Sequence, residues 1–81
     1  MKLPRDFSGA ELARALSRYG YQITRQSGSH MRLSSSCKGT QHHVTIPAHT
    51  PLKIGTLSQI LADVAGYLEL TREQLAKELF G

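Results

Sequence analysis

The chain has 81 residues, and Lys and Arg outnumber Asp and Glu by 10 to 6, which gives a net charge of +4. With 40% apolar and 20% charged residues, its composition is typical of a folded protein and not of a disordered one. No apolar run approaches the length of a membrane span, and the charged start does not resemble a signal peptide. The single cysteine, Cys37, excludes an internal disulfide. We therefore expect one small cytoplasmic domain over residues 1–81, with no membrane attachment.

Positive charge is concentrated in the middle of the chain. No acidic residue lies between Glu11 and Asp63, whereas all four histidines do. The basic residues of this interval are Arg14, Arg18, Arg25, Arg32, Lys38 and Lys53. A basic stretch of this kind suits a polyanion, and nucleic acid is the most common one. The alternative is a solvated basic surface without such a partner.

The first predicted element is a helix that begins after Ser8 and ends at Gly20. Ser8 and Glu11 have the spacing of a capping box, and Phe7 and Leu12 can form a hydrophobic staple around it. Apolar residues at helical spacing follow, and Gly20 is a typical helix stop.

Three strand-like segments follow, over residues 21–26, 29–35 and 41–47. Short turns at Gly28 and Lys38-Gly39 connect them and favour an antiparallel meander. Alternation assigns an inward, apolar face to Tyr21, Ile23, Met31, Leu33, Val44 and Ile46. It assigns the opposite, polar face to His30, Arg32, Ser34, His43 and Thr45. Strict alternation would also turn Arg25 inward, at the end of its strand.

Two further helices are expected after the turn-rich residues 47–51. Thr56 and Gln59 fit a second capping box, with Gly66 as the stop, and Thr71 and Gln74 fit a third. The order αβββα with a short final helix predicts an α+β fold. In it, both main helices cover one face of a three-stranded antiparallel sheet. The apolar residues of the final helix are expected either to pack on the core or to contact a partner.

His30 is the clearest candidate for chemistry, because it follows Gly28-Ser29 on the predicted polar face, beside Arg32. An imidazole can take or give a proton near neutral pH, and a guanidinium can hold a phosphate by two hydrogen bonds. Such groups suit metal-free RNA cleavage. His30 would deprotonate the 2′-hydroxyl or protonate the leaving 5′-oxygen, while Arg32 or Lys53 stabilises charge on the phosphate. From spacing alone, the alternative is an ordinary solvated histidine.

No metal or other cofactor is expected. Cys37, His42, His43 and His49 lie in one stretch, but the adjacent His42 and His43 point to opposite faces of a strand. The spacing also lacks the close ligand pairs of structural zinc sites. Cys37 is expected to be a free thiol in a loop.

An ordered set of short motifs spans about residues 7–65. Ser8-Gly9 with Glu11 comes first, then Gly28-Ser29-His30, then Val44-Thr45-Ile46-Pro47 with His49, and finally Gly55-Thr56-Leu57 with Ile60-Leu61. The set resembles the HicA-type (YcfA-like) toxins, the mRNA interferases of type II toxin–antitoxin pairs. The resemblance implies a fold like a double-stranded-RNA-binding domain and ribosome-independent cleavage of mRNA. It also implies that His30 is catalytic and that a HicB-type antitoxin binds the toxin and masks this histidine.

On this interpretation the chain is an endoribonuclease with His30 as general acid/base, a monomer alone and a hetero-oligomer with its antitoxin. The residues expected to bind RNA are Ser29, Arg32, His43, Lys53 and Arg25, and Ser29 is also a candidate to orient His30. Two alternatives keep the same fold. One is an RNA-binding module without catalysis, and the other is a protein whose basic face only docks an acidic antitoxin.

Overall fold

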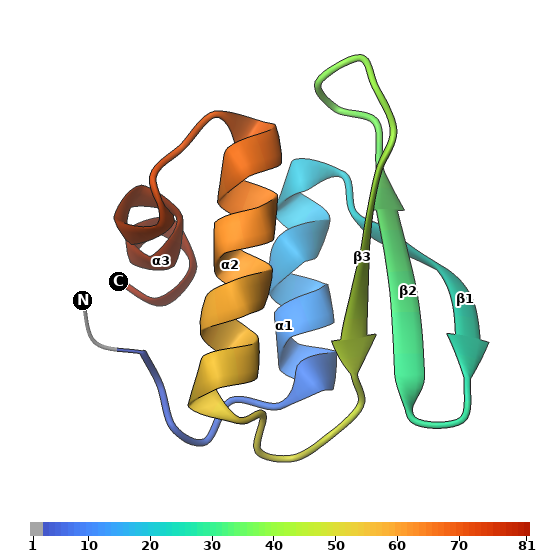
Figure 1. The fold of residues 1–81 in the computed structure, drawn as a ribbon, viewed down its shortest axis with the longest axis vertical. Coiled ribbons are helices and arrows are strands. Elements are labelled where there is room, and N and C mark those ends of the chain that lie inside the picture. The colour runs from blue at the N-terminus through green and yellow to red at the C-terminus, as the bar shows by residue number, and fades with distance from the viewer. Residues whose placement is uncertain (1–2) are drawn as a thin grey trace.

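Three antiparallel strands form a sheet, and two helices cover one of its faces (Figure 1). The computed structural model describes residues 3–81. The elements are α1 (Gly9–Leu16), the 3-10 turn η1 (Ser17–Tyr19), β1 (Gln22–Ser27), β2 (His30–Ser35), β3 (His42–Pro47), α2 (Ile54–Leu68) and α3 (Arg72–Phe80). The strands lie in the order β1-β2-β3. The predicted α+β class and αβββα layout are therefore confirmed.

The start of α1 follows the predicted capping box. Ser8 Oγ accepts a hydrogen bond from the Glu11 backbone N–H at 3.0 Å, and the Glu11 carboxylate accepts one from the Ser8 N–H at 3.1 Å. These bonds satisfy donors that the first turn of a helix leaves free. The helix tightens into η1 at its end, and Gly20 closes it with a φ of +84°, a conformation that glycine adopts without strain.

The edge strand β1 departs from strict alternation. Thr24 is an extra residue between two paired positions, because Ile23 lies opposite Leu33 while Arg25 lies opposite Arg32. This β-bulge turns Arg25 to the face that Arg32 occupies, so the expectation that Arg25 points inward is wrong. Ile23 was expected in the core but remains 50% exposed, because the helices do not cover this edge of the sheet.

The core lies between the sheet and the helices α1 and α2. Its fully buried side chains come from all of these elements: Leu12, Leu16, Tyr21, Leu33, Ile46, Leu57, Leu61 and Val64. The inward faces predicted for β2 and β3 are confirmed, since Met31, Leu33, Val44 and Ile46 are all buried. Within residues 3–81, no helix covers the opposite face of the sheet.

The bounds of α2 differ from the prediction. The helix begins at Ile54 with Lys53 in the N-cap position and without a side-chain cap, so the predicted capping box at Thr56 is wrong. It also continues through Gly66 to Leu68 and ends at Glu69, with a φ of 62°. A glycine inside a helix costs about 1 kcal/mol relative to alanine. Burial of Leu68 beyond it offsets that cost.

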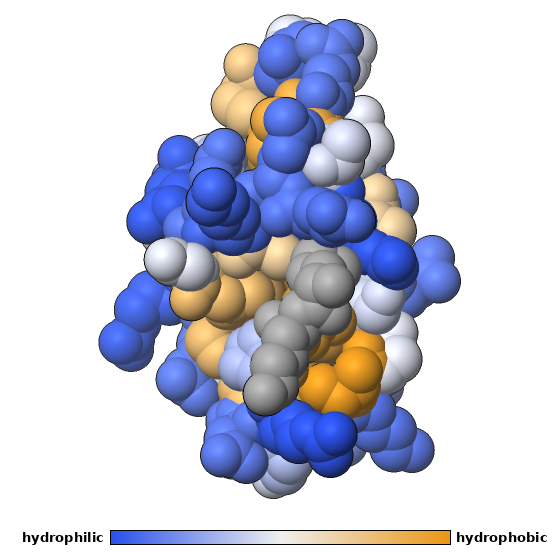
Figure 2. Space-filling view, turned by 90° about the vertical axis from the view of Figure 1, so that its left-hand side faces the viewer, coloured by the Kyte–Doolittle hydropathy of each residue, from blue (hydrophilic) through white to orange (hydrophobic). Residues whose placement is uncertain are grey.

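The final helix α3 packs on the core, which is one of the two predicted alternatives. Its capping box at Thr71 and Gln74 is formed as predicted. Leu75 is fully buried, and the Phe80 ring meets the Phe7 ring edge-to-face with centroids 4.9 Å apart. Figure 1 shows α3 on the far side of α2 from the sheet, and Figure 2 shows this side of the molecule as a mixture of hydrophilic and apolar surface. Of the helices described, none is long and apolar enough to cross a membrane.

Candidate functional site

The open face of the sheet gathers most of the residues that the sequence singles out. Strand pairing places Ser27 opposite His30, Arg25 opposite Arg32, and Ser34 opposite His43. Opposed residues of an antiparallel pair project to the same side, and Arg32 also lies opposite Thr45. His30, Arg32 and His43 therefore share one face, as predicted, and the bulge in β1 adds Arg25 to it.

The charge on this face is positive and unbalanced. No strand contains an aspartate or glutamate, and neither Arg25 nor Arg32 forms a salt bridge with any residue of 3–81. Both arginines are exposed. Two guanidinium groups at opposed positions repel each other unless an anion lies between or over them. The centre of the open face is thus suited to phosphate groups, which a guanidinium holds by paired hydrogen bonds.

His43 is held in a fixed orientation near one end of this face. Its Nδ1 lies 2.5 Å from Ser34 Oγ, and Ser34 Oγ lies 3.2 Å from Thr24 Oγ1. Ser34 is buried beneath these neighbours although it belongs to the polar face. The chain of hydrogen bonds occupies one ring nitrogen of His43, and no hydrogen bond within the described residues engages Nε2.

His30 stands at the other end of the face, where β2 begins. The turn before it uses Gly28 with a φ of +57°, which favours glycine at that position. The imidazole is exposed, and no hydrogen bond or ion pair engages it within the described chain. Ser29 does not hydrogen-bond to His30. Its backbone carbonyl oxygen instead accepts a hydrogen bond from the Ala48 N–H at 2.6 Å.

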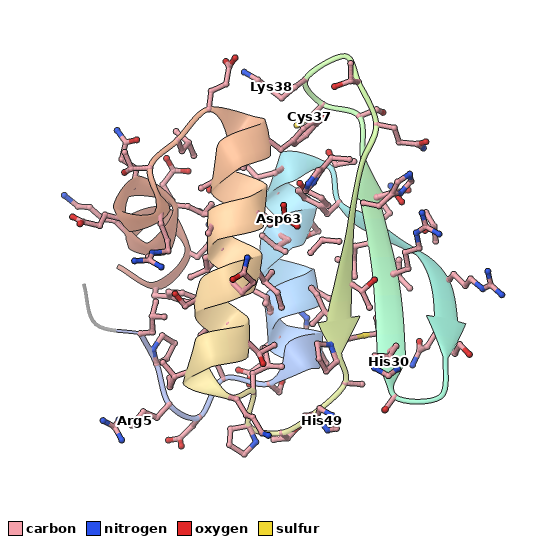
Figure 3. The ribbon with its side chains drawn as sticks, in the orientation of Figure 1. Arg5, His30, Cys37, Lys38, His49 and Asp63 are labelled. Atoms are coloured by element: carbon pink, nitrogen blue, oxygen red, sulfur yellow. The ribbon has the colours of Figure 1, made fainter. Side chains whose placement is uncertain are left out.

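A pocket of about 460 Å³ lies at this same end, between the end of β3 and the first turn of α2. Its lining residues are Pro47, His49, Thr50, Pro51, Leu52, Lys53 and Thr56. Lys53 thus belongs to this pocket and not to the sheet face that carries Arg32. His49 is exposed, and Figure 3 shows it at the end of the molecule where His30 lies. His49 is not among the RNA-binding residues predicted from the sequence. The signal that points to it is its place two residues after Ile46-Pro47.

The family model described as HicA toxin of bacterial toxin-antitoxin matches residues 9–65. The chain belongs to the HicA toxin family. The match runs from the start of α1 through all three strands and most of α2, so it contains the whole open face and the pocket. No curated protein and no solved structure matches the chain.

Membership of the HicA family makes the chain the toxin component of a toxin–antitoxin system, whose partner is an antitoxin. The helix α3 (Arg72–Phe80) lies beyond the matched residues. Its buried Leu75 shows that it belongs to the packed structure of this HicA toxin all the same.

A second polar cluster lies on the helix side of the sheet and joins the β2–β3 hairpin to α2. The Tyr21 hydroxyl is 2.6 Å from His42 Nδ1, and the Tyr67 ring stacks on the His42 ring with centroids 4.8 Å apart. His42 Nε2 lies 3.7 Å from Asp63 Oδ1. Burial raises the pKa of Tyr21 above its ordinary value. The contacts of this cluster are internal, so His42 has a structural place in the HicA fold.

The cysteine and histidine side chains that lie close together in the sequence, between residues 37 and 49, are dispersed in the structure. His42 contacts the helix side, His43 lies on the open face, and Cys37 is exposed in the hairpin. Among residues 3–81, no three His, Cys, Asp or Glu side chains converge as a metal site requires.

Proposed function

We propose that this HicA-family toxin is a metal-independent mRNA interferase that cleaves RNA without the ribosome, with His30 as general acid/base. One observation carries the proposal. Within residues 3–81, an exposed imidazole without a hydrogen-bond or ion-pair partner borders a sheet face that holds two unpaired arginines and no carboxylate. Such a surface can both hold a phosphodiester and transfer a proton to or from it.

In the proposed reaction the 2′-oxygen of the RNA attacks the adjacent phosphorus while the bond from phosphorus to the 5′-oxygen breaks. His30 takes the proton of the 2′-hydroxyl or gives one to the departing 5′-oxygen. Arg32 and Arg25 hold the phosphate groups along the open face and stabilise charge on the reacting one. A positioned acid or base of this kind contributes about 10²–10⁴-fold to the rate.

The other predicted residues also contact the RNA. His43, with Nδ1 on Ser34, presents Nε2 to a second phosphate or a base edge. Lys53 reaches a phosphate from the pocket beside His30, and Ser29 contacts RNA at the turn before it. Single-stranded RNA fits this surface best, because its bases can leave the stack and lie on the open sheet.

The proposed partner is a HicB-type antitoxin that covers His30 and the basic face, so that substrate and antitoxin exclude each other. The chain alone is proposed to be a monomer in the cytoplasm, with residues 1–81 as one domain, and to form a hetero-oligomer with the antitoxin. Carboxylates on the antitoxin would complement Arg25 and Arg32.

The test compares the native chain with His30→Ala on single-stranded RNA in the presence of EDTA. Because His30 is exposed, the variant should keep its fold and most of its RNA affinity but lose cleavage. Gln41→Ala, an exposed change in the hairpin, is the matched control and should cleave normally. Equal cleavage by His30→Ala would refute the assigned residue. RNA binding without cleavage by either chain would establish the binding-module alternative, and no binding at all would favour a surface that only docks an antitoxin.

A further inference from the structure

The loop between β3 and α2 holds its backbone firmly but leaves one imidazole free. The Ala48 N–H donates to Ser29 O at 2.6 Å, the Gly9 N–H donates to His49 O at 3.0 Å, and the Leu52 N–H donates to Phe7 O at 2.8 Å. Leu52 is also buried in the core. The His49 side chain is exposed, and nothing in residues 3–81 hydrogen-bonds to it or pairs with it. The fold therefore fixes the position of His49 without using its side chain.

This fixed position is next to the start of β2. His30 lies opposite Pro47 in the strand register, and the hydrogen bond from Ala48 to Ser29 continues the pairing by one step. His49 follows directly, at the same end of the molecule as His30 (Figure 3). His49 and Lys53 both line the pocket there. An imidazole and an ammonium group thus stand beside the segment that carries the proposed acid/base.

Cleavage of RNA without a metal needs two proton transfers. One group takes the proton of the attacking 2′-hydroxyl, and another gives a proton to the 5′-oxygen that leaves. The attacking and leaving oxygens lie on opposite sides of phosphorus, so one imidazole is poorly placed to serve both. With His30 alone, one of the two proton transfers therefore has no group to take or to give the proton.

We propose that His49 is the second proton-transfer group of the cleavage reaction, complementary to His30; this inference rests on the proposed function. The 2′-oxygen forms a bond to phosphorus as the bond to the 5′-oxygen breaks. One imidazole takes the 2′ proton, and the other, which begins as imidazolium, protonates the 5′-oxygen. The products are a 2′,3′-cyclic phosphate and a 5′-hydroxyl, and Lys53 balances charge on the non-bridging oxygens.

The test measures single-turnover cleavage of single-stranded RNA, across pH, by the native chain, His30→Ala, His49→Ala and His49→Gln. Both substitutions at His49 should leave the thermal midpoint and the RNA dissociation constant unchanged, because the side chain is exposed and the loop is held by backbone bonds. The cleavage rate should fall by about 10²–10⁴-fold. The bell-shaped pH profile of the native chain should lose one limb in the His49 variants and the other in the residual activity of His30→Ala.

A second substrate assigns the roles. RNA with sulfur in place of the 5′-oxygen at the cleaved bond has a leaving group that needs no proton. This substrate should restore the rate of only one of the two alanine variants, the one that lacks the acid. Normal cleavage by His49→Ala, or a loss confined to RNA affinity, would overturn the inference while the role of His30 stands. No cleavage by the native chain would overturn both.

Discussion

Gly9 lies so close to the last residue of β3 that a Cβ atom on it would be 2.0 Å from the carbonyl oxygen of Pro47. The contact is backbone against backbone, so no flexible side chain can yield. The Gly9 N–H also donates a hydrogen bond to the carbonyl oxygen of His49. The first residue of α1 thereby positions the loop that carries His49, although His49 lies 40 positions further along a chain that passes through three strands in between.

Gly9→Ala should therefore act on both stability and cleavage. Forcing the loop away from α1 resembles overpacking, which costs about 1–3 kcal/mol, and it shifts His49 relative to His30. Thermal denaturation and RNA cleavage measure the two effects. Gly66→Ala is the matched control, since its Cβ would meet nothing within 4 Å inside α2. That change should leave cleavage intact and stabilise the protein by up to about 1 kcal/mol. Equal behaviour of the two variants would contradict the proposed role of the Gly9 contact.

Arg25 and Arg32 should each contribute to RNA affinity through phosphate contacts. For single-stranded RNA, each lost contact lowers the slope of log affinity against log salt by about 0.7. We expect Arg25→Gln and Arg32→Gln each to weaken binding and to reduce the slope by this amount. Fluorescence anisotropy over a range of salt concentrations measures it. Lys77→Gln on the exposed side of α3 is the control and should change neither quantity. An unchanged slope for Arg25→Gln would remove this residue from the binding surface.

Tyr21 should make the protein less stable at alkaline pH. Tyrosine in an unfolded chain ionises near pH 10, whereas burial raises the pKa of Tyr21 in the folded protein. Above about pH 10 the unfolded state loses a proton that the folded state keeps, so the free energy of unfolding falls by up to about 1.4 kcal/mol per pH unit. Below that pH the group adds no dependence.

Urea denaturation between pH 7 and 11 tests this effect with Tyr21→Phe. The variant should lose the alkaline decline that Tyr21 causes. Near neutral pH it should be about 1 kcal/mol less stable, because His42 loses its hydrogen-bond partner. An alkaline decline of the same size in the variant would assign the effect to another group.

The helix α3 should be required for stability although it lies outside the residues that the family model matches. Leu75→Ala removes a fully buried side chain and should cost about 2–5 kcal/mol. Lys77→Ala, on the exposed side of the same helix, should cost less than about 0.5 kcal/mol. Chemical denaturation of both variants measures the difference. Similar stabilities would mean that α3 is not held by its buried residues.

Local sequence patterns predict two helix starts and the outward faces of two strands correctly. Capping boxes at Ser8 and Thr71 mark the starts of two helices. The alternation in β2 and β3 is sufficient to place His30, Arg32 and His43 on one face. The bulge at Thr24 was not predictable, because no local pattern marks an extra residue in an edge strand. The place of Arg25 depends on it. The start of α2 at Ile54 also differs from the prediction, since the helix begins without the side-chain cap that Thr56 suggests.

The pocket beside His30 is formed by long-range contacts, which local sequence patterns do not predict. The bonds from Gly9 to His49 and from Ala48 to Ser29 join segments far apart in the chain. In the sequence, the signal for His49 is its place in the short motif that begins with Ile46-Pro47. Its relation to His30 required the strand register, which fixes Pro47 opposite His30.

The opposed arginines have a consequence for the lifetime of the free protein. Arg25 and Arg32 lie opposite each other, and no carboxylate of residues 3–81 forms an ion pair with either of them, so the two guanidinium groups repel each other. A bound polyanion or an acidic protein surface relieves that repulsion and adds its own binding free energy to the folded state. The free toxin then unfolds more often than the bound toxin and is more susceptible to proteolysis. On the proposed function, binding of RNA or of the antitoxin to this one surface would decide both whether the toxin acts and how long it persists.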